Sequence, residues 1–161
     1  MTQSDAIAQF EKHARQFVKW CKTDHDGAAP KQFKVEALRH LSSVYNSALY
    51  LPEVEFKRSP EAPRTTDVQR QVVAQNLSAL PFQYYWVLCE PALPDTDTEP
   101  GCGDLFDDFQ DIYADISSGL WLFDAGHVEA AVYSWREMFR LHWGPHVVSA
   151  LHALHSFEYG E

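Results

Sequence analysis

The residues whose types and spacing could support chemistry lie in two segments near the C-terminal end of the chain. Residues 104–123 carry five aspartates, and residues 128–156 carry four histidines. The aspartates are Asp104, Asp107, Asp108, Asp111 and Asp115, and the histidines are His142, His146, His152 and His155. If the two segments form antiparallel helices, carboxylates and imidazoles come close to one another. This is the one place in the sequence where we expect a chemical site.

Four of these residues could bind a divalent metal ion. Asp108 and Asp111 lie three residues apart, which places them on one helix face. His142 and His146 lie four apart and share a face only if their helix continues through Pro145. Hard ions prefer carboxylates, transition metals prefer imidazoles, and a bound ion could activate water for hydrolysis. The Glu-x-x-His pairs of di-metal helical bundles are absent from the sequence.

The same residues could instead form a structural network between the last two helices. Arg136 and Arg140 precede the histidines. They could neutralise Asp111 or Asp115, and neutral histidines could both donate and accept within the network. The candidate members of this interaction or polar network are Asp104, Asp107, Asp115, Arg136, Arg140 and Trp143.

Three of the aspartates are unusual for their position in a helix. Asp104 and Asp107 suit a helix N-terminus, where the helix dipole favours negative charge. Asp108, Asp111 and Asp115 fall further along the same acidic stripe, where aspartate is a poor helix former and like charges four apart repel. Such breaks of a local rule indicate either a functional site or a partner that neutralises the charges.

Charge is distributed unevenly along the chain, whose formal net charge is −10. Residues 1–70 have a net charge of +2, residues 71–161 have −12, and residues 71–135 contain no Lys or Arg. An acidic half of this kind repels phosphate backbones, so we expect no direct nucleic-acid binding there. It could attract a basic protein partner or divalent cations, or it could be a solvated surface that aids solubility.

Several classes of protein are disfavoured by what the sequence lacks. No apolar run approaches the roughly 20 residues that span a bilayer, and the N-terminal residues do not have the pattern of a secretory signal. The three cysteines form no CxxC pair, which favours reduced thiols and a cytoplasmic protein without a membrane partner. The sequence also contains no glycine-rich phosphate-binding loop and no recognisable nucleophile motif.

The hydrophobic spacing predicts one all-α domain, residues 1–161, built as a bundle of five to six helices. We expect helices over 4–22, from Pro30 to before Pro52, over 67–80, from 104 to before Gly126, over 128–141 and over 145–156. Thr66 and Gln69 have the spacing of a capping box. Gly144-Pro145 either kinks the last helix or starts a new one with the proline in its first turn.

The connections are predicted less uniquely than the helices. Residues 82–88 are an aromatic run that fits either a short core helix or an extended segment. Residues 90–103 contain three prolines, two glycines and four acids, and we expect a loop that could cover a neighbouring site.

Four motifs in the C-terminal half carry a family resemblance. They are YYW at 84–86, DLxDDxxDIYxDxxxGL at 104–120, WxxxFxxHWGxH at 135–146 and ALxALH at 150–155. Together they resemble bacterial domain-of-unknown-function family 5063, from about Leu80 to His155, whereas residues 1–79 are similar only in looking helical. The resemblance implies an all-helical, cytosolic bacterial protein in which the aspartate-rich and HWGxH segments act as a unit, and it implies no activity.

The sequence departs from this family pattern at two positions. Pro145 stands where the resemblance implies a helix-compatible residue, and His152 stands where it implies an arginine. The second departure removes one permanent cation that could have neutralised the aspartates.

Two functions of different classes follow from these observations. The sequence favours a non-enzymatic interaction or accessory protein whose acidic face binds a basic protein partner, and its oligomeric state stays open. The alternative is a divalent-metal-dependent helical-bundle hydrolase that uses the four Asp and His residues at 108, 111, 142 and 146. The first predicts exposed, diverging aspartates, and the second predicts at least three carboxylate or imidazole groups around a common point.

Overall fold

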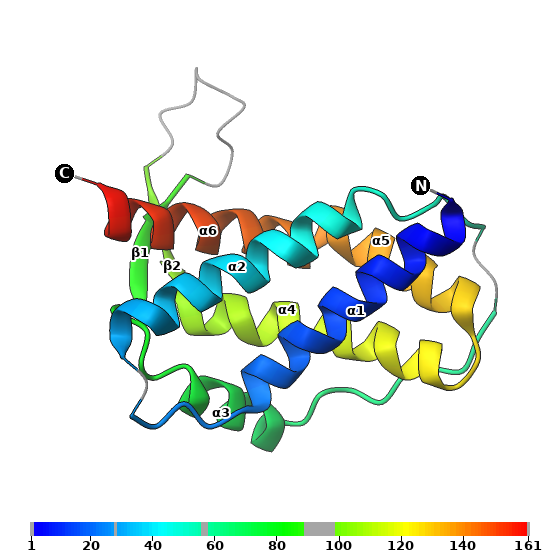
Figure 1. The fold of residues 1–161 in the computed structure, drawn as a ribbon, viewed down its shortest axis with the longest axis horizontal. Coiled ribbons are helices and arrows are strands. Elements are labelled where there is room, and N and C mark those ends of the chain that lie inside the picture. The colour runs from blue at the N-terminus through cyan, green and yellow to red at the C-terminus, as the bar shows by residue number, and fades with distance from the viewer. Residues whose placement is uncertain (1, 28, 56–57, 89–98, 161) are drawn as a thin grey trace.

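The chain is helical over most of its length in the computed structural model (Figure 1). The structure describes residues 2–27, 29–55, 58–88 and 99–160. Within these ranges it contains six α-helices and one two-stranded sheet, which confirms the predicted all-α bundle of five to six helices. The elements are α1 (Gln3–Lys22), α2 (Pro30–Ala48), α3 (Asp67–Asn76), β1 (Tyr84–Val87), β2 (Gly101–Asp104), α4 (Leu105–Asp124), α5 (Val128–Leu141) and α6 (Trp143–Tyr159).

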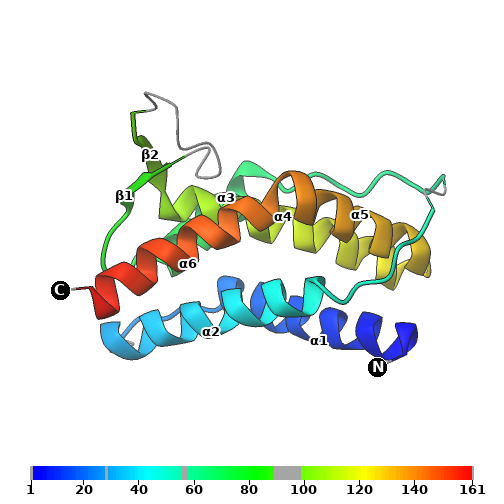
Figure 2. The same cartoon turned by 90° about the horizontal axis from the view of Figure 1, so that it is seen from above.

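The helices form two layers with an aromatic core between them. Figure 2 shows α1 and α2 in one layer and α4 and α5 in the other, with α6 packed against α2, α4 and α5. Phe10 of α1 lies against Trp135 and Trp143, with ring centroids 4.8 and 6.0 Å apart. Phe17 stacks on Phe109 of α4 at 6.1 Å, and all five rings are fully buried. Removing such apolar area from water is the main favourable contribution to folding.

Local sequence signals determine where three helices begin. The Thr66 hydroxyl accepts from the Gln69 amide, and the Gln69 side chain accepts from the Thr66 amide, which confirms the predicted capping box. Pro30 lies in the first turn of α2. The Asp104 carboxylate accepts from the Phe106 amide at 2.9 Å and so begins α4 at the start of the acidic segment.

The aromatic run after Leu80 forms the first strand of a small hairpin. Tyr84–Val87 is β1, so the extended alternative is correct, and it pairs antiparallel with Gly101–Asp104. The prediction of a loop was therefore wrong for residues 101–103, and residues 90–98 of that loop lie outside the described part of the chain. Tyr85 lies opposite Gly103, where a Cβ would come within 2.4 Å of the tyrosine ring. The glycine thus leaves the space that the ring occupies.

The last two helices are separate rather than one kinked helix. His142 lies between α5 and α6 with φ −140° and ψ −78°, values that break regular helix geometry. Pro145 lies in the first turn of α6, where its missing N–H has no helical acceptor to serve. The second of the two alternatives for Gly144-Pro145 is therefore confirmed.

Gly119 allows α4 and α5 to approach closely. A Cβ at this position would lie 2.1 Å from Trp135 Nε1. The same Nε1 donates a hydrogen bond to the Ile116 carbonyl at 3.2 Å, so the indole is fixed against the backbone of α4. The glycine near the end of the acidic motif is thus explained by the close packing of α4 against α5.

We expect Gly119→Ala to destabilise the protein by about 1–3 kcal/mol, because the added methyl must displace the Trp135 indole from its hydrogen bond. This effect opposes the gain of about 1 kcal/mol that alanine brings to a helix interior. Urea denaturation measures the difference, with the neighbouring Ser118→Ala as the matched control. A Gly119→Ala variant as stable as the control would contradict the close approach.

Candidate functional site

The acidic stripe of α4 differs in exposure along its length. Asp104 caps the helix with one carboxylate oxygen, and its other oxygen accepts from the side-chain amide of Gln83 at 2.9 Å. Asp107 is exposed, whereas Asp108 is only 5% exposed. Asp111 and Asp115 are half-buried. The three aspartates that are unusual for a helix interior are therefore the three that face other parts of the protein.

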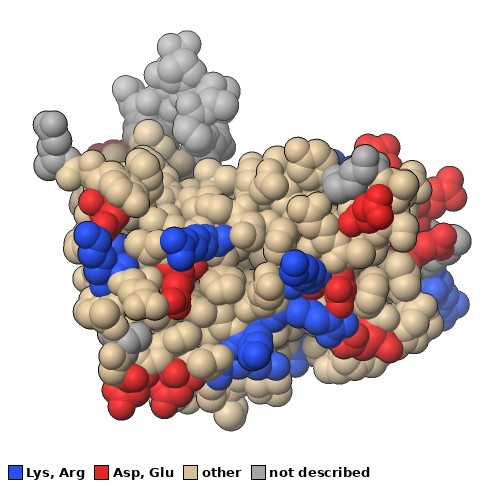
Figure 3. Space-filling model, in the orientation of Figure 1, with Lys and Arg blue, Asp and Glu red and all other residues tan. Residues whose placement is uncertain are grey.

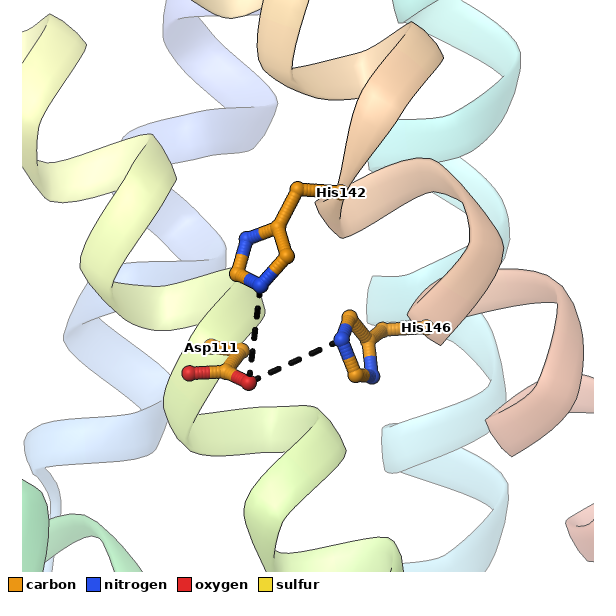
Figure 4. A group of neighbouring side chains, drawn as sticks. All are labelled: Asp111, His142 and His146. Carbon is orange, nitrogen blue, oxygen red and sulfur yellow. Dashed lines mark ion pairs between the residues drawn. The ribbon is translucent and has the colours of Figure 1, made fainter. Parts of the chain in front are cut away.

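Two imidazoles from the α5–α6 junction face this stripe. His142 is the residue between the helices, and His146 lies in the first turn of α6. Figure 4 shows the Asp111 carboxylate directed toward both rings. Its Oδ2 lies 3.7 Å from His142 Nε2 and 3.6 Å from His146 Nε2. Asp111, His142 and His146 each offer one ligand atom, and these atoms all lie within 4.8 Å of one another.

The opposite side of each imidazole is held by a different carboxylate. His142 Nδ1 lies 2.7 Å from Asp115 Oδ2, and His146 Nδ1 lies 2.7 Å from Asp108 Oδ1. A neutral imidazole that donates from Nδ1 to these acceptors presents the lone pair of Nε2 toward Asp111. Two ring nitrogens and one carboxylate oxygen are thus aimed at one small region.

The hairpin supports this arrangement through one phenol. The Tyr85 hydroxyl donates to Asp108 Oδ2 at 2.5 Å, and Asp108 uses its other oxygen for His146. The ring reaches this position because Gly103 leaves its space open on the paired strand. The sequence signal for this contact was the YYW motif, but the sequence alone does not show that Tyr85 reaches an aspartate of α4.

The permanent cation of the site comes from α3. Arg70 donates to Asp111 Oδ1 at 2.8 Å, which leaves Asp111 Oδ2 for the two imidazoles. Sequence reasoning missed this residue. The only signal was its position as the last cation before residues 71–135, which contain none.

The two arginines expected to neutralise the aspartates contact other groups, so that expectation was wrong. Arg136 donates to the Leu51 carbonyl at 2.6 Å and lies 3.3 Å from the Glu53 carboxylate. Arg140 pairs with Glu137 at 3.2 Å, three residues earlier on α5. Both arginines therefore lie on faces of α5 that point away from the aspartates of α4. Closeness in sequence to the histidines did not reveal this difference of helix face.

Trp143 is a core residue rather than a member of the polar cluster. It is fully buried, and its Nε1 donates to the Trp135 carbonyl at 3.1 Å. The two remaining histidines of the sequence pattern also lie apart from the cluster. His155 packs on Tyr159, with ring centroids 5.0 Å apart, and His152 lines a pocket beside α5.

The protonation equilibria of the site reflect burial and paired charge. The hydrogen bond with Asp108 raises the pKa of His146, an effect that burial partly opposes. Burial raises the pKa of Asp115, and its hydrogen bond with His142 opposes this. Burial and then the Asp108 carboxylate raise the pKa of Tyr85 further above neutrality, and its protonated hydroxyl donates to Asp108. The Asp108 carboxylate therefore favours the protonated form of His146, whereas burial favours the neutral form of Asp115.

The fold and this cluster define a helical bundle that carries two histidines and three buried or half-buried aspartates at one helix junction. The chain belongs to the family described as "Domain of unknown function (DUF5063)", whose model matches residues 2–160. This confirms the resemblance seen in the C-terminal motifs and extends it over the N-terminal half of the chain.

One solved structure has a similar fold. Protein BF1032 from Bacteroides fragilis is similar with a TM-score of 0.79 at 22% identity, over 97% of this chain and 94% of that chain. At this identity the likeness shows the fold alone. No curated protein matches the chain. Among the described residues, no helix has both the length and the apolar character needed to cross a membrane.

We expect Arg70→Met to destabilise the protein by about 1 kcal/mol, because it removes the hydrogen-bonded cation from the half-buried Asp111. Arg140→Met is the matched control, since it breaks an exposed pair within α5 and should change stability by less than about 0.5 kcal/mol. Urea denaturation in the presence of EDTA measures both. Equal stability of the two variants would contradict the structural role of Arg70.

Proposed function

We propose that this protein is a divalent-metal-dependent enzyme of hydrolytic type whose ion is held by Asp111, His142 and His146. The observation that carries the proposal is the gap between the three ligand atoms. Both Nε2 atoms point at the same carboxylate oxygen but stop 3.6 and 3.7 Å from it, beyond the 3.2 Å or so of a normal hydrogen bond. A purely structural network would be expected to close this gap.

The dimensions of the gap support an ion rather than direct pairing. Nitrogen and oxygen ligands lie about 2.0–2.2 Å from a zinc ion, which places tetrahedral neighbours about 3.4 Å apart. The separations from Asp111 Oδ2 exceed this by only a few tenths of an ångström, and side-chain rotation can supply such a shift. Two histidines and one carboxylate suit Zn²⁺, Mn²⁺, Fe²⁺ or Ni²⁺ better than Mg²⁺ or Ca²⁺, which prefer oxygen ligands.

The proposed chemistry follows from the number of protein ligands. Three ligands leave at least one coordination position open, as in catalytic rather than structural zinc sites. An ion in such a site lowers the pKa of a coordinated water toward neutrality and so supplies a nucleophile for hydrolysis.

Asp108 takes a different role in this proposal from the one the sequence suggested. It was a candidate ligand, but its oxygens face the Nδ1 atom of His146 and the Tyr85 hydroxyl. We therefore assign Asp108 and Asp115 as positioning residues that fix the tautomer and orientation of the two histidines. Carboxylate–histidine pairs of this kind tune many metal centres.

The interaction hypothesis receives less support from the same geometry. It required exposed and diverging aspartates, whereas Asp108, Asp111 and Asp115 converge on histidines and Arg70. Figure 3 shows the face formed by α1 and α2, where Lys and Arg are interspersed with Asp and Glu. A basic protein partner therefore stays a sequence-based alternative.

A cytoplasmic location is part of the main proposal and is supported by the free thiols Cys21 and Cys102.

We expect a transition-metal ion to raise the melting temperature of EDTA-treated protein in a saturable manner, because the ion binds the native state. The apparent gain is about 2.7 kcal/mol at roughly one hundred times the dissociation constant. Asp111→Asn and His142→Ala should abolish the rise, and Asp115→Asn should weaken binding by about tenfold to a hundredfold through the orientation of His142. Asp107→Asn, an exposed aspartate of the same stripe, is the matched control and should bind as the parent does.

The outcome that removes this function is a melting temperature indifferent to Zn²⁺, Mn²⁺, Fe²⁺ and Ni²⁺. An equal response of Asp111→Asn and Asp107→Asn would also place the ion elsewhere. If binding follows the expected order, the loaded protein is assayed with phosphate-ester and carboxylic-ester substrates, with Asp111→Asn as the inactive reference.

A further inference from the structure

A cavity lies on the side of the α5–α6 junction that faces α2 and the hairpin. Its volume is about 740 Å³, and its walls come from α2, β1, α5 and α6. Asp111, His142 and His146 are not among the described residues that line it. The cavity is therefore separate from the proposed metal ligands, and its size falls within the roughly 300–1,000 Å³ typical of small-molecule sites.

The walls of this pocket are mainly aromatic and aliphatic. Tyr45, Trp86 and Phe139 contribute three rings, and Val148 adds an aliphatic surface. The Trp86 side chain is 77% exposed and Val148 is 50% exposed, so large apolar groups face water at the pocket. Scattered single residues of this kind need no explanation, but their grouping around one concave site is typical of a binding surface.

The charge of the pocket is opposite to that of the chain as a whole. The sequence contains 23 Asp and Glu residues against 13 Lys and Arg. None of the acidic residues in the described ranges lines the pocket, whereas Arg140 and His152 do. The Arg140 side chain is 70% exposed and, among the described residues, pairs with Glu137 at 3.2 Å on the same helix. Such exposed pairs are weak, so the guanidinium can exchange this partner for an anionic ligand.

We propose that this pocket binds a small amphipathic organic anion, with an aromatic body against Tyr45, Trp86 and Phe139 and a single acid group on Arg140. A planar guanidinium forms paired hydrogen bonds with a carboxylate or sulfonate, and the rings offer faces on which an aromatic body stacks. The apolar walls supply most of the contact area, and the arginine selects anions over neutral analogues.

The proposal does not depend on the metal centre. It can be tested in EDTA, so a failure of metal binding leaves its outcome unaffected. The probe is 1-anilinonaphthalene-8-sulfonate, and the matched neutral probe is N-phenyl-1-naphthylamine, which has the same rings without the sulfonate. Both dyes fluoresce when they leave water, and each is titrated against the full-length protein below its melting temperature.

We expect the sulfonate dye to bind at a single saturable site and more tightly than the neutral dye. Arg140→Met should weaken the sulfonate dye about fivefold, which corresponds to one exposed charge-assisted contact, and should leave the neutral dye within about twofold. Arg39→Met removes an exposed arginine of α2 that is outside the pocket lining, and it should bind both dyes as the parent does. Val148→Trp fills the pocket and should weaken both dyes at least tenfold.

The acid group and the ring are tested separately by displacement. 1-Naphthoate should displace the sulfonate dye, 1-naphthalenemethanol should do so much less well, and decanoate should be weaker than 1-naphthoate. Tighter displacement by decanoate would overturn the aromatic assignment.

Three further results would overturn the proposal. One is unchanged dye binding in a folded Val148→Trp variant, and another is an equal effect of Arg140→Met and Arg39→Met. The third is a dimer in sedimentation that Val148→Trp dissociates, because a second copy of the chain would then be the occupant of the pocket.

Discussion

A buried carboxylate must be paired or hydrogen-bonded, and this requirement at Asp108 links three parts of the fold. The residue is 5% exposed, and its carboxylate accepts from the Tyr85 hydroxyl of the hairpin and contacts His146 of α6. Leaving such a group without partners costs several kcal/mol. The hairpin, α4 and the first turn of α6 are therefore held together by one side chain, and the orientation of His146 follows from it.

The same requirement at the next two aspartates distributes the site over further elements. Asp111 takes its cation from α3, and Asp115 takes its donor from the residue between α5 and α6. Each carboxylate thus has its own partner, and no two compete for the same donor. Within this cluster, both Nε2 atoms face Asp111 Oδ2 without coming within hydrogen-bonding distance of it. The Nδ1 atoms of both histidines are hydrogen-bonded to carboxylates, whereas their Nε2 atoms have no partner at hydrogen-bonding distance in the cluster. We expect this arrangement of a binding site rather than of a structural network.

The parts of this arrangement that sequence could predict are those set by helical period. The spacing of the aspartates, the capping aspartate and the proline after His142 placed carboxylates and imidazoles near one another. Arg70 and Tyr85 could not be predicted, because they reach the site from other elements through tertiary packing. Asp108 and Asp111 lie on one face, so their spacing alone did not distinguish a ligand from a residue that orients a ligand. The second strand was not predicted either, because the prolines and two glycines of residues 90–103 favour a loop. The need for glycine at position 103 comes from the Tyr85 ring packed against it, which is a tertiary contact.

Tyr85 gives the two proposed sites a shared side chain. Its ring lines the pocket, while its hydroxyl donates to Asp108. Because Asp108 also holds His146 Nδ1, this tyrosine connects a wall of the pocket with the carboxylate that orients one of the proposed metal ligands. The short hairpin is therefore the element that contributes a side chain to both proposed sites.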